Sequence, residues 1–128
     1  LQEAIKQLQP IAQAAKAAAR EVCSLEEQTG IRIAHYPSWV ECRDYDRTAS
    51  FVASLDLVIT VCTTVHHLGG ALGVPTWTLV PSRPSWRYQI EGETLPWYSH
   101  AVLFRQTIDG SWREPIERVV DELADFRC

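Results

Sequence analysis

Hydrophobic positions recur at helical spacing in three parts of the chain. The segment from Gln2 to about Gln28 is rich in Ala, Gln, Glu, Lys and Leu, which favour helix, and Gly30 follows its end. Tyr45 to Leu55 carries apolar residues three and four positions apart, and residues 113–126 repeat that pattern. We therefore predict one kinked helix or two helices in the first segment and a single helix in each of the others.

The first part of the chain leaves one alternative open. Residues 22–25 could form a short strand within the helical segment, because periodicity does not separate the two conformations over so few residues. After Gly30, alternation of Ile31 and Ile33 in a stretch that stops at Pro37 predicts a strand over residues 31–36.

The middle of the chain alternates between strand and helix. Residues 57–61 are a continuous, largely β-branched run of the kind found in strands buried on both faces. A helix over 63–72, closed by Gly73, and a strand over 76–80 follow. A connection this short predicts a parallel pair of strands. A long loop over 81–99, holding at most one short helix, leads to a last strand over 101–106.

These elements predict the fold class. Strands that alternate with helices are typical of a three-layer α/β sandwich, with a parallel sheet of four or five strands and helices on both faces. We expect residues 1–128 to form a single Rossmann-like domain with a helical lead-in over 1–29. The chain contains no methionine and opens directly on the helical pattern, which predicts a fragment of a longer protein.

Composition narrows the classes of partner. The net charge of −4 and the absence of a basic stretch disfavour nucleic acid and anionic membranes as partners. No apolar run reaches the roughly 18 to 20 residues of a membrane span, and no signal-peptide pattern is present, so we expect a soluble, cytoplasmic protein. The cysteines lack metal-ligand spacing and indicate reduced thiols, without a zinc site or disulfides; they are Cys23, Cys42, Cys62 and Cys128.

The strongest candidate site begins where the strand over 57–61 ends. A helix that starts at the carboxyl end of a parallel strand points free N–H groups and a positive dipole end into the ligand crevice of the sheet. The hydroxyls of Thr63 and Thr64 can add hydrogen bonds to a phosphate, and His67 lies one turn further along the same face. The pattern predicts an anion site suited to a diphosphate. The alternative is that Thr63 only caps the helix and that Gly69 and Gly70 only allow close packing on the sheet.

The same stretch carries a family resemblance. Residues 56–75, DLVITVCTTVHHLGGALGVP, resemble the donor-site signature DLVISVDT-x3-HLAGALG-x-P of glycosyltransferases related to the lipopolysaccharide heptosyltransferases. Further matches are Trp86-Arg87-Tyr88, Pro96-Trp97-Tyr98 and Leu103-Phe104-Arg105-Gln106, which resemble the branch that often carries tetratricopeptide repeats. The likeness covers about residues 30–123.

The resemblance implies the carboxy-terminal half of a GT-B fold, the half that binds the nucleotide-diphosphate-sugar donor. By this likeness the donor phosphates or sugar contact Thr63, Thr64 and His67, and no metal or other cofactor is required. Cys62 and Arg87 complete the predicted donor and phosphate site, Arg87 from its place in the long loop on the ligand side of the sheet. The acceptor site and the catalytic base would belong largely to the missing amino-terminal domain. The isolated domain is therefore expected to bind donor without transferring sugar.

One departure from the family pattern lies within the signature. Cys62 stands where the family has aspartate, and Thr64 stands where it has alanine or glycine. In the family this carboxylate would bind the sugar or order the turn. Without it, both the identity of the donor and the activity are open. Two alternatives follow: a degenerate, non-catalytic binding module, and a thiol enzyme or redox sensor in which the helix end lowers the pKa of Cys62 and His66 lies one turn on.

The long loop and the strand ends supply further candidates. A nucleoside pocket could be lined by side chains that follow two strands; they are Tyr36, Pro37, Pro81 and Trp86. Arg83 could reach phosphate, whereas Trp86, Trp97 and Tyr98 could equally be anchors that pin the loop. For Arg105 and Gln106 a structural hydrogen-bonding role and a ligand contact remain open, and His100 is expected at the surface.

Overall fold

The computed structural model describes residues 20–34 and 44–126. The chain divides into two units, Leu1–Pro37 and Ser38–Cys128. In the first unit, residues 20–29 are helical, which confirms that part of the predicted helix and excludes a strand over 22–25. The rest of the predicted lead-in helix lies outside the described residues.

The predicted strand over 31–36 is wrong for residues 31–34, which are irregular, and residues 35 and 36 lie outside the described residues. The backbone here hydrogen-bonds to the preceding helix instead of to a neighbouring strand. Gly30 N donates to the Glu26 carbonyl at 2.9 Å, and Ile33 N donates to Glu26 Oε1 at 2.7 Å. Because these local acceptors satisfy the amide groups, the segment with alternating Ile31 and Ile33 does not pair with a neighbouring strand.

The second unit alternates between helices and strands, as predicted. In chain order its elements are α3 (Tyr45–Ala53), β1 (Val58–Val61), α4 (Thr64–Leu72), β2 (Thr76–Val80), the 3-10 turn η1 (Trp86–Tyr88), β3 (Ala101–Arg105) and α5 (Arg113–Asp125).

Local chemistry explains where the helices begin and end. The Asp44 side chain caps α3 by accepting a hydrogen bond from Asp46 N at 3.1 Å. α3 ends two residues earlier than predicted, where Ser54 N donates back to Phe51 O. α4 ends at Gly73, whose φ of 75° lies in the left-handed region that glycine adopts without strain.

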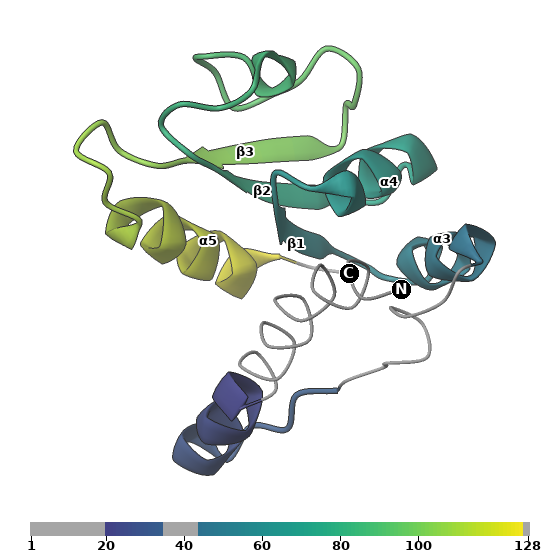
Figure 1. Ribbon diagram of the computed structural model, residues 1–128, viewed down its shortest axis with the longest axis vertical. Coiled ribbons are helices and arrows are strands. Elements are labelled where there is room, and N and C mark those ends of the chain that lie inside the picture. Colours follow the sequence, from purple (N-terminus) through teal and green to yellow (C-terminus); the bar gives the residue numbers. More distant parts are fainter. Residues whose placement is uncertain (1–19, 35–43, 127–128) are drawn as a thin grey trace, which may run out of the picture. The chain divides into compact units, whose positions relative to one another are not determined.

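The three strands form one parallel sheet in the order β1-β2-β3 (Figure 1). Val58 pairs with Thr76 in the first ladder, and Thr76 pairs with Ala101 in the second. The unit is therefore an α/β fold, and the described residues form three strands where we predicted four or five.

Helices cover both faces of the sheet. Side chains alternate along a strand, so Thr76 and Thr78 face one side and Trp77 faces the other. α4 covers the threonine side, since its His66 hydrogen-bonds to Thr78. α5 covers the tryptophan side, where Trp77 packs with Phe104 and Val119. This three-layer arrangement confirms the predicted layers.

Two expectations about burial are wrong in part. On β1, predicted to be buried on both faces, Ile59 is 44% exposed and Val61 is 51% exposed. β1 is the edge strand of the described sheet, and the core cluster of α5 is built on β2 and β3. Of the hydrophobic residues that recur three and four positions apart along α5, only Val119 belongs to the buried core.

Within the described residues, no helix combines the length and apolar character that crossing a membrane requires.

Candidate functional site

The start of α4 directly follows the end of β1, with only Cys62 and Thr63 between them. Thr63 occupies the N-cap position, but its side chain makes no capping hydrogen bond. Its Oγ1 lies 3.4 Å from Thr60 Oγ1 instead. The amide of His66 donates to the Thr63 carbonyl at 3.2 Å. The Thr63 hydroxyl does not compete for the amides of Thr64 and Val65, and these remain for solvent or an anion.

A pocket of about 360 Å³ opens at this helix end. We call it the polar pocket; it is lined by Cys62, Thr63, Thr64, His67, Ser85, Arg87 and Tyr88. It thus brings together all five residues predicted for donor or phosphate binding, from the turn after β1, from α4 and from η1. Arg87 supplies a cation, and the lining contains no carboxylate. Hydroxyls, helix amides and a guanidinium around one space can bind a phosphate group.

His67 lies between two tyrosine hydroxyls. Its Nδ1 is 3.3 Å from the Tyr98 hydroxyl oxygen, and its Nε2 is 3.5 Å from that of Tyr88. In a neutral imidazole one nitrogen donates and the other accepts, and a hydroxyl can do either. The two tyrosines therefore fix the plane of the ring beside the polar pocket.

The neighbouring histidine, His66, has a structural place. Its side chain is fully buried, and Nδ1 lies 2.7 Å from Thr78 Oγ1 on β2. Its Nε2 atom is buried without a hydrogen-bond partner. Burial, with a smaller contribution from the charge of His67, lowers the pKa of His66 to about 4. His66 is therefore neutral at physiological pH and ties α4 to the sheet.

The environment of Cys62 contradicts the expectation of a lowered thiol pKa. Burial raises the pKa of Cys62, while a hydrogen bond with Tyr88 and the charge of Arg105 oppose the shift without reversing it. The thiol Sγ points to the Leu79 carbonyl at 3.8 Å. His66, the base expected one turn on, pairs with Thr78 instead. Cys62 is thus a largely protonated thiol at neutral pH.

Both central glycines of α4 are required by close packing. A Cβ atom on Gly69 would collide with Thr76 Oγ1, so this glycine lets the helix approach β2. A Cβ atom on Gly70 would collide with the Tyr98 ring. Gly69 therefore serves packing on the sheet, whereas Gly70 leaves space for a side chain that lines a second pocket.

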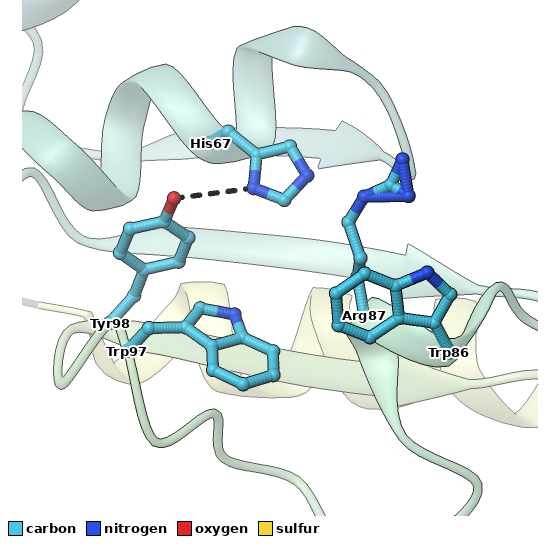
Figure 2. A pocket seen from close by; sticks show the side chains of 5 residues that line it. All are labelled: His67, Trp86, Arg87, Trp97 and Tyr98. Atoms are coloured by element: carbon cyan, nitrogen blue, oxygen red, sulfur yellow. Dashed lines mark hydrogen bonds between the residues drawn. The ribbon is translucent and has the colours of Figure 1, made fainter.

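This second pocket has a volume of about 370 Å³ and shares the lining residues His67 and Arg87 with the first. We call it the aromatic pocket; it is lined by His67, Trp86, Arg87, Trp97 and Tyr98. In Figure 2 both indoles and the Tyr98 ring lie around the space next to His67, with the Arg87 guanidinium near Trp86. The guanidinium carbon lies 5.4 Å from the Trp86 ring centroid, a cation–π contact.

The loop that carries η1 is held by Arg105 at the end of β3. Its guanidinium donates to four backbone carbonyls, those of Tyr88, Gln89, Glu91 and Gly92, at 2.6 to 3.2 Å. Gln106 also has a structural role, because its side chain accepts from Ser82 N and donates to the Gly110 carbonyl. The structural alternative is therefore the correct one for both residues.

The structure describes two of the four residues predicted for a nucleoside pocket, and these two share neither of the pockets. Trp86 lines the aromatic pocket, Pro81 lines neither pocket, and Tyr36 and Pro37 lie outside the described residues. Arg83 and His100 are exposed and line neither pocket. Ser85 and Tyr88 were missed as pocket residues. Tyr88 belongs to the Trp86-Arg87-Tyr88 motif, which was the available signal, whereas nothing in the sequence marks Ser85.

Across residues 20–34 and 44–126, no group of three or more His, Cys, Asp or Glu side chains is placed to hold a metal ion.

Comparison with known proteins gives one similarity. The chain is 31% identical to Protein FlbA of Caulobacter vibrioides over 107 residues, which cover 83% of this chain and 17% of FlbA. The chain thus spans less than a fifth of the length of that curated relative. No protein-family model and no solved structure matches the chain.

Proposed function

We propose that this chain is the donor-binding domain of a nucleotide-sugar glycosyltransferase, a Rossmann-like half of a GT-B fold related to the heptosyltransferases. The polar pocket would hold the diphosphate of the donor at the amino-terminal end of α4. The supporting observation is the convergence of Thr63, Thr64, His67 and Arg87 on one pocket at an uncapped helix end.

The physical chemistry of the pocket favours a leaving-group site. As a sugar departs from a nucleoside diphosphate, negative charge grows on the terminal phosphate. Helix amides and the Arg87 guanidinium stabilise such charge, and the Thr63 and Thr64 hydroxyls donate to phosphate oxygens. This set of donors needs no metal. The acceptor, whether glycan, lipid or protein, and the catalytic base would be supplied by another domain of a cytoplasmic enzyme.

The test is a calorimetric titration of the full-length protein with ADP, GDP, UDP and inorganic pyrophosphate. We expect saturable binding of at least one nucleoside diphosphate and weaker binding of pyrophosphate. Thr63→Val keeps the shape of the side chain and removes its hydroxyl. We expect it to lower the affinity for the nucleoside diphosphate and for pyrophosphate several-fold. His67→Ala should do the same.

A matched control is Thr94→Val, because Thr94 is exposed and lines neither pocket. It should bind as the unmodified protein does. Absence of binding for all four compounds, or equal affinities for Thr63→Val and Thr94→Val, would contradict the proposed diphosphate site.

A non-catalytic binding module is the second candidate, and Cys62 is the observation that favours it. A half-buried thiol stands where the related transferases have a carboxylate, and its pKa is raised. Such a domain would bind nucleotide as tightly as an active transferase domain does, but it would transfer no sugar. Turnover of a nucleotide sugar by the full-length protein, compared with Cys62→Asp, separates the two.

A further inference from the structure

The two pockets share two of their lining residues. His67 and Arg87 belong to both, while the remaining residues of the aromatic pocket are rings and those of the polar pocket are mainly hydroxyls. A ligand that fills both would place an anionic group at the start of α4 and a flat or apolar ring beyond His67. The pair of pockets is therefore matched to a bipartite molecule.

The aromatic pocket is built for a ring with few hydrogen-bonding demands. Three of its five lining residues are the aromatic Trp86, Trp97 and Tyr98, and the Tyr98 hydroxyl is already paired with His67 Nδ1 at 3.3 Å. The Arg87 guanidinium already lies over Trp86. A sugar ring carries a hydroxyl on most of its carbons, and each of these loses free energy if it is desolvated without a partner. A nucleobase stacks through its faces and has no such requirement there.

The two tryptophans are also unusually exposed for their size. Trp86 is 78% exposed and Trp97 is 46% exposed, although both are large apolar side chains. The backbone that presents Trp86 is held in place, because Arg105 binds the carbonyl of Tyr88, two residues further on, at 2.7 Å. Exposed aromatic rings on a fixed backbone form a platform that a ligand can cover without reorganising the loop.

We propose that the aromatic pocket binds the nucleobase of the nucleotide whose diphosphate occupies the polar pocket, with the base in contact with both Trp86 and Trp97. This inference rests on the proposed function for the position of the diphosphate. The proposed base site differs from the nucleoside pocket expected around Pro81, because it pairs Trp86 with Trp97. The sugar of the donor then lies outside the aromatic pocket.

The test combines saturation-transfer NMR with calorimetry on the full-length protein. The ligands are ADP, GDP and UDP, their nucleosides, and inorganic pyrophosphate. For the nucleotide that binds best, we expect the strongest saturation on the protons of the base. Trp97→Leu and Trp86→Leu should each lower the affinity for that nucleotide by about tenfold, which is the effect of losing one stacking contact. The affinity for pyrophosphate should stay unchanged.

Two further variants make the result specific. Trp86→Phe retains an aromatic face and should recover most of the affinity that Trp86→Leu loses. Trp112→Leu serves as the control, because Trp112 lies at the start of α5 and outside both pockets. Since Trp86 is mostly exposed, its replacement should leave the unfolding temperature unchanged.

The outcomes separate this inference from the proposed function. Binding of a nucleotide and of pyrophosphate, with affinities insensitive to Trp86 and Trp97, would overturn the base site and retain the diphosphate site. Tryptophan-dependent binding of nucleotide and nucleoside that Thr63→Val leaves unchanged would support the base site and overturn the diphosphate site. Failure of all seven ligands would overturn both.

Discussion

The Nδ1 atom of His67 lies 3.3 Å from the hydroxyl oxygen of Tyr98, and this contact joins α4 to the loop that precedes β3. The two residues are far apart in the sequence, yet they fix the boundary between the polar and aromatic pockets. His67 on α4 is thus positioned by the hydroxyl of Tyr98 on the loop.

Removing the Tyr98 hydroxyl tests this positioning. In Tyr98→Phe, His67 keeps only its longer contact with Tyr88, so its ring gains freedom. We expect nucleotide affinity to fall about three- to tenfold and the free energy of unfolding to fall by about 1 kcal/mol, the typical net value of one hydrogen bond. Calorimetry and urea unfolding measure both quantities.

Tyr45→Phe is the control for that experiment, because Tyr45 is half-exposed at the start of α3 and lines neither pocket. It should change neither affinity nor stability measurably. If Tyr98→Phe behaves as Tyr45→Phe does, the hydroxyl has no part in holding His67.

The glycine beneath Tyr98 gives a second prediction. In Gly70→Ala the new methyl group meets the Tyr98 ring, which must move. The gain in helix propensity, about 1 kcal/mol, is then outweighed by overpacking of about 1 to 3 kcal/mol. We expect a net loss of stability in thermal unfolding, together with loss of nucleotide binding as the aromatic pocket changes shape.

Ala71→Gly on the exposed next position reports the effect of helix propensity alone. It should destabilise by about 1 kcal/mol and leave nucleotide affinity intact. Equal affinities for the two variants would show that Tyr98 can shift without affecting the pocket.

Much of the second unit was predictable because local patterns decide it. Each strand and helix from Tyr45 to Asp125 falls within a few residues of its expected range, since caps, β-branched runs and the Gly73 stop act over neighbouring residues. The exposure of Ile59 and Val61 was not predictable, because a β-branched run does not reveal whether its strand lies at the edge of the sheet.

The same distinction holds for the candidate site. Thr63, Thr64 and His67 share one short segment, so their proximity followed from the strand-to-helix turn. Arg87 joins them from a loop whose backbone carbonyls are bound by Arg105, on a later strand. Such a contact depends on tertiary structure and leaves no periodic trace in the sequence.

His66 predicts a dependence of stability on pH. Its pKa is about 4 in the folded protein and about 6.5 in the unfolded chain, so between these values the unfolded state binds more protons. Stability attributable to this group is therefore complete above pH 6.5 and decreases as the pH falls toward 4, by about 3 kcal/mol.

Urea unfolding at pH 7, 6, 5 and 4.5 measures that dependence. His66→Gln removes the titrating group, and its stability should vary less over this interval, whatever its stability at pH 7. Identical pH slopes for the two proteins would mean that other groups are responsible for the acid sensitivity.

Cys62 predicts a slow reaction with alkylating agents. Only the thiolate is nucleophilic, and burial raises the pKa of this thiol. With iodoacetamide at pH 7.5, Cys62 should be modified at least tenfold more slowly than the exposed Cys23, as followed by peptide mass spectrometry. A faster reaction at Cys62 would revive the thiol-enzyme hypothesis. Nucleotide present in the polar pocket should slow the reaction further, because Cys62 lines that pocket.

Arg105 gives the prediction that bears most directly on how the site is held together. The planar guanidinium binds four loop carbonyls at once, whereas a lysine ammonium at the same position has three donors on a flexible stem. Arg105→Lys should therefore destabilise the protein by about 1 to 3 kcal/mol, because the loop carbonyls lose hydrogen bonds to a charged donor. Amide exchange should accelerate over residues 86–93, and nucleotide affinity should fall as Arg87 and Trp86 lose their fixed positions. Arg113→Lys, on the exposed start of α5, is the matched control and should leave all three measurements unchanged. Faster exchange over 86–93 with unchanged nucleotide affinity would show that the bound nucleotide orders this loop itself, and that Arg105 contributes to stability alone.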